Sequence, residues 1–136
     1  MVKNIMTCVE KQEDFFMDQF IRLPQAELEI MLIIWKAEGA VSSTYILEKF
    51  RTKREWALPT LMTVLTRLVN KGFITCTKEG RNNRYTATSN GDDYKRMFIS
   101  DILKEMFDGS LEKLMGSLIE AGAITADDAK NAVKNL

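Results

Sequence analysis

The residues that could do chemistry in this chain are a polar series at helical spacing. Thr60, Thr63 and Arg67 recur every three or four residues, so they would share one face of an α-helix. A threonine offers a hydroxyl and a methyl group, which suit a hydrogen-bonding base edge or a thymine methyl in the major groove of DNA. An arginine one turn further on suits a phosphate. Taken alone, such a face is also what a solvent-exposed helix presents.

Two further arginines favour the DNA interpretation. Arg81 and Arg84 lie in the run of residues 78–84, which is rich in turn-forming residues. Arginines have little structural purpose at a turn, so we interpret these two as contacts to DNA phosphates. The candidate DNA-binding residues are therefore Thr60, Met62, Thr63, Thr66, Arg67, Arg81 and Arg84.

Three amphipathic segments must position these side chains. Pro24 opens the first, which ends at Glu38. Ser42 or Ser43 would cap the second. The third spans residues 59–71, and its apolar residues recur at spacings of three and four, which predicts one buried face. These apolar residues are Leu61, Val64, Leu65, Leu68 and Val69.

After Gly72 the period of the pattern changes from 3.6 to 2. Residues 73–77 and 85–88 are predicted strands, and the turn-rich run between them makes a β-hairpin with a basic tip. Within the first strand, Cys76 is expected to be a buried free thiol. Three helices followed by such a hairpin is the order of a winged helix-turn-helix, with the third helix as the DNA reader and the hairpin as the wing.

A basic cluster at the end of the second helix has two interpretations. Lys49, Arg51, Lys53 and Arg54 could contact DNA, or they could simply match the negative end of the helix dipole. Both interpretations stay open at the level of sequence.

The rest of the chain is helical and apolar on one side. Residues 94–107 and 110–119 form amphipathic helices, and a Thr-x-x-Asp pattern from Thr125 to Asp128 caps a last one. These helices are too exposed to close a core of their own, so we expect them to pair with a second copy of the chain. The predicted dimerisation residues are Ile99, Ile102, Leu103, Met106, Leu111, Leu114, Met115 and Leu118.

The fold class is therefore mainly α with a small β-hairpin wing, a winged helix-turn-helix domain followed by a C-terminal helical dimerisation region. We expect a poorly patterned leader over residues 1–22, the DNA-binding domain over residues 23–88 and the dimerisation region over residues 89–136. Residues 23–88 hold ten basic and six acidic residues, a net charge of +4, whereas residues 89–136 carry −3. This asymmetry fits a nucleic-acid-binding module joined to a protein-protein module.

What the sequence lacks limits the other function classes. There is no histidine, which removes the commonest general base, and the two cysteines cannot form a metal cluster. We therefore expect no catalytic residue, no metal and no cofactor. The longest apolar run, residues 30–35, falls far short of the roughly 20 residues that a transmembrane helix needs. With no convincing signal peptide either, we expect a cytoplasmic protein without direct membrane insertion.

Three blocks of the sequence resemble the penicillinase repressor family of winged-helix regulators. They are residues 23–31 (LPQAELEIM) with Trp35, residues 60–74 (TLMTVLTRLVNKGFI), and residues 78–81 (KEGR) with Tyr85. The resemblance implies a homodimer that binds double-stranded operator DNA and represses genes for resistance to cell-wall antibiotics. It also implies release by a membrane sensor-protease that triggers cleavage in the dimerisation region.

The chain departs from this family pattern at identifiable positions. Met62 stands where the family commonly has a lysine, and Pro59 where it has a serine or lysine. The cleaved bond of the best-known members joins Asn to Phe, and the nearest match here is the bond between Ser117 and Leu118. The cysteine cluster of the copper-responsive branch is absent, so copper sensing is not expected.

The sequence therefore predicts a dimeric transcriptional repressor of the penicillinase-repressor type, released by proteolysis or another signal. Two alternatives stay open. One is a winged-helix repressor that responds to a small molecule, and the other is a winged-helix protein-interaction module that does not bind DNA.

Overall fold

A computed structural model describes residues 22–136. The expected leader, residues 1–22, lies outside the described residues except for Arg22. The chain divides between Tyr94 and Lys95 into two compact units. The mainly α fold with a small antiparallel sheet agrees with the prediction.

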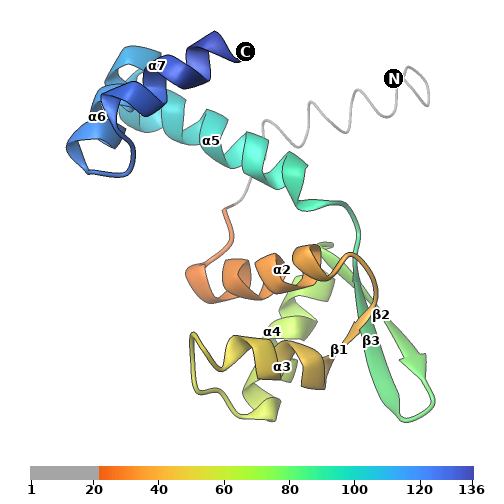
Figure 1. The fold of residues 1–136 in the computed structure, drawn as a ribbon. Helices are drawn as coiled ribbons and strands as arrows, with labels where there is room; N and C mark the ends of the chain where they lie inside the picture. Colours follow the sequence, from red (N-terminus) through yellow and green to blue (C-terminus); the bar gives the residue numbers. More distant parts are fainter. Residues whose placement is uncertain (1–21) are drawn as a thin grey trace, which may run out of the picture. The chain divides into compact units, whose positions relative to one another are not determined.

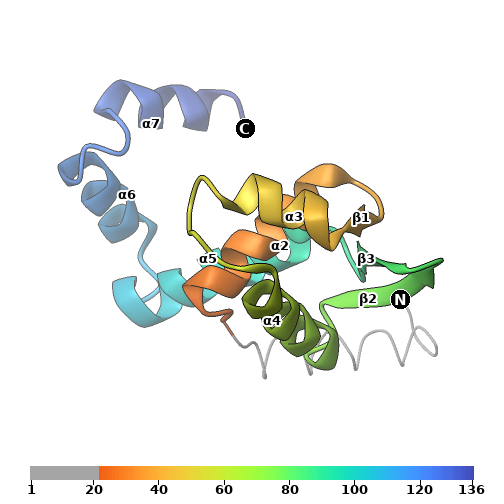
Figure 2. The same ribbon diagram turned by 90° about the horizontal axis from the view of Figure 1, so that it is seen from below.

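The first unit packs three helices against one another, with a small sheet beside them (Figures 1 and 2). Its helices are α2 (Gln25–Ala37), α3 (Ser43–Phe50) and α4 (Leu58–Asn70), and its strands are β1 (Val41–Ser42), β2 (Ile74–Glu79) and β3 (Asn82–Ala87). The largest fully buried side chains come from all three helices and from the start of β2. They are Phe50, Ile30, Met31, Ile34, Ile46, Leu61, Leu65, Leu68 and Ile74.

The sheet has a third strand that the sequence did not predict. Its strand order is β1-β3-β2, and β1 pairs antiparallel with β3 through Val41 opposite Tyr85 and Ser42 opposite Arg84. The side chain of Ser42 also accepts a hydrogen bond from the backbone N–H of Tyr45, which confirms it as the cap of α3. A strand of two residues carries no alternating pattern, so periodicity could not reveal it.

The hairpin is tighter than expected. Strands β2 and β3 pair from Ile74 opposite Ala87 to Glu79 opposite Asn82, so only Gly80 and Arg81 form the turn. Gly80 has φ +65°, the conformation that a two-residue hairpin turn with glycine at its first central position requires. The prediction of a turn over residues 78–84 was therefore wrong, because the ladder continues through both of its flanks.

Cys76 was also placed wrongly: its side chain is exposed, not buried. It lies on β2, the edge strand of the sheet, where only Ile74 is buried. Alternation of apolar and polar residues predicted a buried face, but β2 has a neighbouring strand on one side only, and its residues after Ile74 are exposed.

The first turn of helix α5 (Gly91–Phe107) completes the core of the first unit. Tyr94 is buried and its ring lies 5.6 Å from that of Trp35 and 6.1 Å from that of Phe73. Its hydroxyl accepts a hydrogen bond from the backbone N–H of Leu23 (2.9 Å), which joins the start of the domain to its end. The folded unit therefore extends beyond Ser89, where the sequence placed the boundary.

The second unit contains the rest of α5, with α6 (Leu111–Glu120) and α7 (Ala126–Lys134). Ser110 caps α6 by accepting from the N–H of Lys113, and Thr125 and Asp128 form both bonds of a capping box at α7. None of residues 95–136 is buried in the single chain. Over residues 22–136, no helix combines the length and the apolar character needed to cross a membrane.

The close contact at Gly91 gives a test of the first unit's packing. A Cβ atom at this position would lie 2.8 Å from Cδ2 of Trp35. Gly91→Ala should therefore lower the free energy of unfolding by about 1–3 kcal/mol, as overpacking a core does. Guanidinium denaturation followed by circular dichroism measures the change.

Gly39→Ala is the matched control, because nothing lies within 4 Å of a Cβ atom there. This variant should be unchanged or more stable by up to about 1 kcal/mol. Equal stability of the two variants would show that Trp35 does not pack against α5 as described.

Candidate nucleic-acid interface

The buried face of α4 decides which of its side chains point outward. Leu61, Leu65 and Leu68 have no exposed surface, so the opposite side of the helix faces solvent. Four exposed residues at spacings of four, three and four form what we call the outward face: Pro59, Thr63, Thr66 and Asn70. Two predicted DNA-binding residues, Thr63 and Thr66, lie there. Pro59 and Asn70 were not among the predicted residues, although helical spacing alone places them on this face.

The threonines of the outward face are held as hydrogen-bond acceptors. The hydroxyl of Thr63 donates to the carbonyl of Pro59 (3.1 Å), and that of Thr66 donates to the carbonyl of Met62 (3.0 Å). Each hydroxyl proton is therefore used within the helix, while the oxygen keeps a free lone pair. Such a pair can accept from the amino groups of adenine or cytosine and can contact a thymine methyl.

Met62 lies on the side of α4 that meets the wing. It is half-buried, and its sulfur lies 3.8 Å from the hydroxyl of Tyr85, which donates to it. Tyr85 lies in β3 and is only 3 % exposed, and this burial raises the pKa of its phenol. Of the seven predicted DNA-binding residues, Met62 is thus the one whose side chain links the helix to the hairpin.

The two wing arginines occupy different positions. Arg81 lies at the hairpin turn, and no acidic group within residues 22–136 forms an ion pair with it. Arg84 lies inside β3, and its Nε is 3.3 Å from a carboxylate oxygen of Glu79. The premise that both arginines lie at a turn without a structural partner is correct for Arg81 and wrong for Arg84.

Two carboxylates of α2 neutralise two of the cations around α4. Glu27 is 6 % exposed and its oxygen lies 2.6 Å from Nζ of Lys71, while Glu29 lies 3.1 Å from Nε of Arg54. Gln25 donates a further hydrogen bond to Glu29 (3.1 Å). The bond from Gln25 first, and then the pairing with Arg54, hold the pKa of the Glu29 carboxyl below its ordinary value.

Two of the four residues in the basic cluster at the end of α3 have structural partners. Arg54 has a structural partner in Glu29, and Nζ of Lys49 lies 5.6 Å from the ring centre of Tyr45, a cation–π contact. Arg51 and Lys53 have no ion-pair partner in the described part of the chain, so the DNA interpretation stays open for them.

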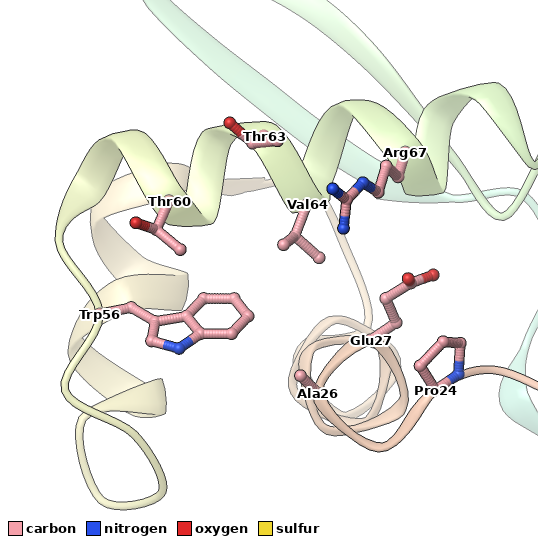
Figure 3. A pocket seen from close by; sticks show the side chains of 8 residues that line it. All are labelled: Pro24, Ala26, Glu27, Trp56, Thr60, Thr63, Val64 and Arg67. Atoms are coloured by element: carbon pink, nitrogen blue, oxygen red, sulfur yellow. The ribbon is translucent and has the colours of Figure 1, made fainter.

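Thr60 and Arg67 lie on the flank of α4 that faces α2. Together with Thr63 they line an open cleft whose other wall is the start of α2 (Figure 3). Arg67 is exposed and forms no ion pair among the described residues. The first unit therefore leaves Arg67 and Arg81 uncompensated while it pairs Arg54, Lys71 and Arg84.

The predicted dimerisation residues form stripes on the helices of the second unit. Ile99, Met106 and Leu111 are 49 %, 68 % and 64 % exposed. The other predicted residues are half-buried; these are Ile102, Leu103, Leu114, Met115 and Leu118. Ser117 is exposed, and the bond between Ser117 and Leu118 lies within the last turns of α6.

One protein-family model matches residues of both units of this chain. The model described as penicillinase repressor matches residues 23–136, which include both units. The chain belongs to the penicillinase repressor family. The predicted resemblance is thereby confirmed, and the family is one of DNA-binding transcriptional regulators.

Two relatives match this chain over most of its length. The chain is 26 % identical to the penicillinase repressor of Bacillus licheniformis over 112 residues, which cover 82 % of this chain and 87 % of the relative. It is 28 % identical to the methicillin resistance regulatory protein MecI of Mammaliicoccus sciuri over 106 residues, 78 % of this chain and 85 % of the relative.

Among solved structures, the chain is similar to the monomeric form of Bacillus licheniformis BlaI in complex with the blaP half-operator. The sequence identity is 32 %, the match covers 56 % of this chain and 92 % of that one, and the TM-score is 0.46.

The hydrogen bond from Gln25 and the ion pair with Arg54 make the contribution of Glu29 to the free energy of unfolding depend on pH. Because the folded-state pKa of this carboxyl lies below its ordinary value of 4.5, the carboxylate stabilises the fold above that pH. The contribution is lost as the pH falls through the folded-state pKa. Glu29→Gln should therefore be less stable than wild type at about pH 7, and the difference should shrink towards about pH 3.

Urea denaturation at both pH values measures the difference. Glu48→Gln is the control, since Glu48 is exposed on α3 and pairs with no cation among the described side chains. It should follow the wild-type pH dependence. A gap between wild type and Glu29→Gln that is constant with pH would show that the carboxylate does not stabilise the fold in this way.

Proposed function

We propose that this member of the penicillinase repressor family is a dimeric repressor that binds double-stranded operator DNA in the cytoplasm. The observation that carries the proposal is the outward face of α4, flanked by Arg67 and followed by Arg81 at the hairpin turn. Acceptor oxygens, methyl groups and uncompensated guanidinium groups are what a helix needs to read a major groove between two phosphate backbones.

Within this proposal the residues divide by role. Thr63 and Thr66 meet base edges, and Thr60 lies at the edge of the reading face. Arg67 and Arg81 bind phosphates, and Arg84, which also pairs with Glu79, adds a weaker contact. Met62 positions the wing through Tyr85 and contributes to the surface beside the bases.

The genes under control would be those for resistance to cell-wall antibiotics, such as β-lactamase-like genes. The names of the relatives support this, since one is a penicillinase repressor and another a methicillin resistance regulator.

Dimerisation is proposed through the second unit. No residue among positions 95–136 is buried, so apolar side chains of this unit are exposed to water in the single chain. Soluble proteins rarely expose large apolar patches in this way. A second copy would bury the stripes of α5 and α6 and would set the separation of two α4 helices for successive major grooves.

Release is proposed to follow cleavage by a membrane sensor-protease, or another signal, in the same region. The bond between Ser117 and Leu118 is protected by local structure: the carbonyl of Ser117 accepts from the N–H of Ala121 (2.9 Å), and that of Leu118 accepts from the N–H of Ala123 (3.0 Å). A protease needs an extended strand, so this end of α6 must unwind before the bond can be cut.

Phosphate contacts make a prediction about salt. Each phosphate that an arginine neutralises contributes about −0.9 to the slope of log K against log salt. Arg67→Ala and Arg81→Ala should each weaken binding to all duplexes similarly and flatten the slope by about one, whereas Arg84→Ala should flatten it less. Fluorescence anisotropy titrations over a range of salt concentrations measure the slope.

Lys134→Ala is the matched control, because it removes one exposed positive charge from α7 in the second unit. It should leave the slope unchanged. An unchanged slope in the Arg67→Ala/Arg81→Ala double variant would contradict the DNA interface, and absence of salt-dependent DNA binding altogether would favour the protein-interaction alternative.

The second unit makes a prediction about association. Leu114→Asp should place a carboxylate in the dimer interface, where burying it without a partner costs several kcal/mol. The variant should sediment as a monomer, keep the helical circular dichroism of the first unit and bind a full operator much more weakly. Analytical ultracentrifugation with operator titration measures both effects.

Leu32→Asp is the control, since it makes the same change at a side chain of α2 that is 43 % exposed. It should sediment as the wild type does. If Leu114→Asp stays dimeric, or becomes monomeric and still binds the full operator as tightly as wild type, repression does not depend on this interface.

A further inference from the structure

The cleft between α2 and α4 is open to solvent and has the volume of a small-ligand site. Its volume is about 440 Å³, within the range of roughly 300–1,000 Å³ of small-molecule sites. Apolar side chains form much of its wall, with a few polar groups among them, which is the usual composition of such sites. The lining residues are Pro24, Ala26, Glu27, Trp56, Thr60, Thr63, Val64 and Arg67, and all of them belong to the first unit (Figure 3).

The cleft carries one uncompensated positive charge. Its acidic group, Glu27, is matched by Lys71 at 2.6 Å. Its cationic group, Arg67, forms no ion pair with any residue of the described range. The charge balance of the lining therefore favours an anionic ligand, and a guanidinium group binds a carboxylate through two parallel hydrogen bonds.

One wall of the cleft is an aromatic ring held in place from behind. Trp56 is half-buried, and its ring meets that of Phe50 edge to face, with centroids 5.0 Å apart and an interplanar angle of 68°. Phe50 itself is fully buried, so it fixes the indole in position. A fixed indole near Val64 offers a planar ligand a surface on which to stack (Figure 3).

We propose that this cleft binds a small planar aromatic carboxylate, with the carboxylate on Arg67 and the ring against Trp56 and Val64. A DNA phosphate could also reach Arg67, but it would make no use of the apolar wall, so the lining favours the aromatic acid. Thr63 and Arg67 belong both to the cleft and to the DNA-reading side of α4. A bound acid therefore competes with DNA and acts as an inducer, a consequence that rests on the proposed function.

The binding step is tested with 2-naphthoate and the full chain in the absence of DNA. Isothermal titration calorimetry should give a dissociation constant on the order of 1 mM, as expected for a ligand of this size. Arg67→Met should weaken binding about tenfold because a charge-assisted hydrogen bond is lost. Ala26→Leu should weaken binding similarly by filling the cleft, without removing any charge.

Two controls distinguish binding of 2-naphthoate in the cleft from non-specific attraction of an anion to positive side chains. Arg81→Met removes another arginine without an ion-pair partner among the described residues, one that does not line the cleft, and should leave the affinity for 2-naphthoate unchanged. The neutral 2-naphthamide should bind about tenfold more weakly than the acid to the wild-type protein. Equal weakening by Arg81→Met, equal affinity for acid and amide, or no heat of binding at several times 1 mM would each overturn the proposal.

A second titration, with operator DNA present, tests the regulatory consequence. 2-naphthoate should weaken DNA binding by the wild-type protein, and about tenfold more of it should be needed for the same effect on Ala26→Leu. If 2-naphthoate binds as expected but the affinity for DNA does not change, the result contradicts competition between acid and DNA and still supports the ligand site in the cleft. If the chain binds no DNA at all, the proposed function fails and the ligand-only titration still decides the cleft.

Discussion

The burial of one face of α4 is the constraint on which the rest of the structure depends. Leu61, Leu65 and Leu68 are fully buried, and each such side chain stabilises the fold by roughly 1.5–3 kcal/mol. Together they contribute about as much as the whole net stability of a small domain, roughly 5–15 kcal/mol. Turning the helix to present another face would forfeit this free energy, so the positions of Thr63 and Thr66 on the surface are set by the core behind them.

Ion pairs with α2 determine which positive charges remain unpaired around α4. Helix α2 lies across the cleft from α4 and supplies Glu27 and Glu29, which pair with Lys71 and Arg54. Both pairs join segments distant in sequence, and both remove a positive charge from the neighbourhood of α4. Arg67 and Arg81 keep theirs. The result is a surface on which a few cations of defined position, not a general excess of positive charge, would meet an anionic partner.

Periodicity and helix capping made much of the fold predictable from the sequence. The stripe from Leu61 to Leu68 placed α4, and Ser42, Ser110 and the Thr125–Asp128 capping box marked three helix starts correctly. The features that the sequence missed depend on contacts between distant segments. Strand β1 exists only because β3 lies beside it, and Arg84 has a partner only because Gly80 allows a turn of two residues. The α2–α4 cleft and the link from Tyr94 to Leu23 are likewise invisible until the chain is folded.

The central claim is that the outward face of α4 reads DNA bases through Thr63 and Thr66. Methyl NMR of the full chain with labelled threonine methyl groups tests it most directly, using an operator duplex selected from a random library. We expect the methyl resonances of Thr63 and Thr66 to shift on binding, while that of Thr125 at the start of α7 stays unchanged. Tight, salt-dependent binding that leaves the Thr63 and Thr66 methyl groups unperturbed would contradict the account.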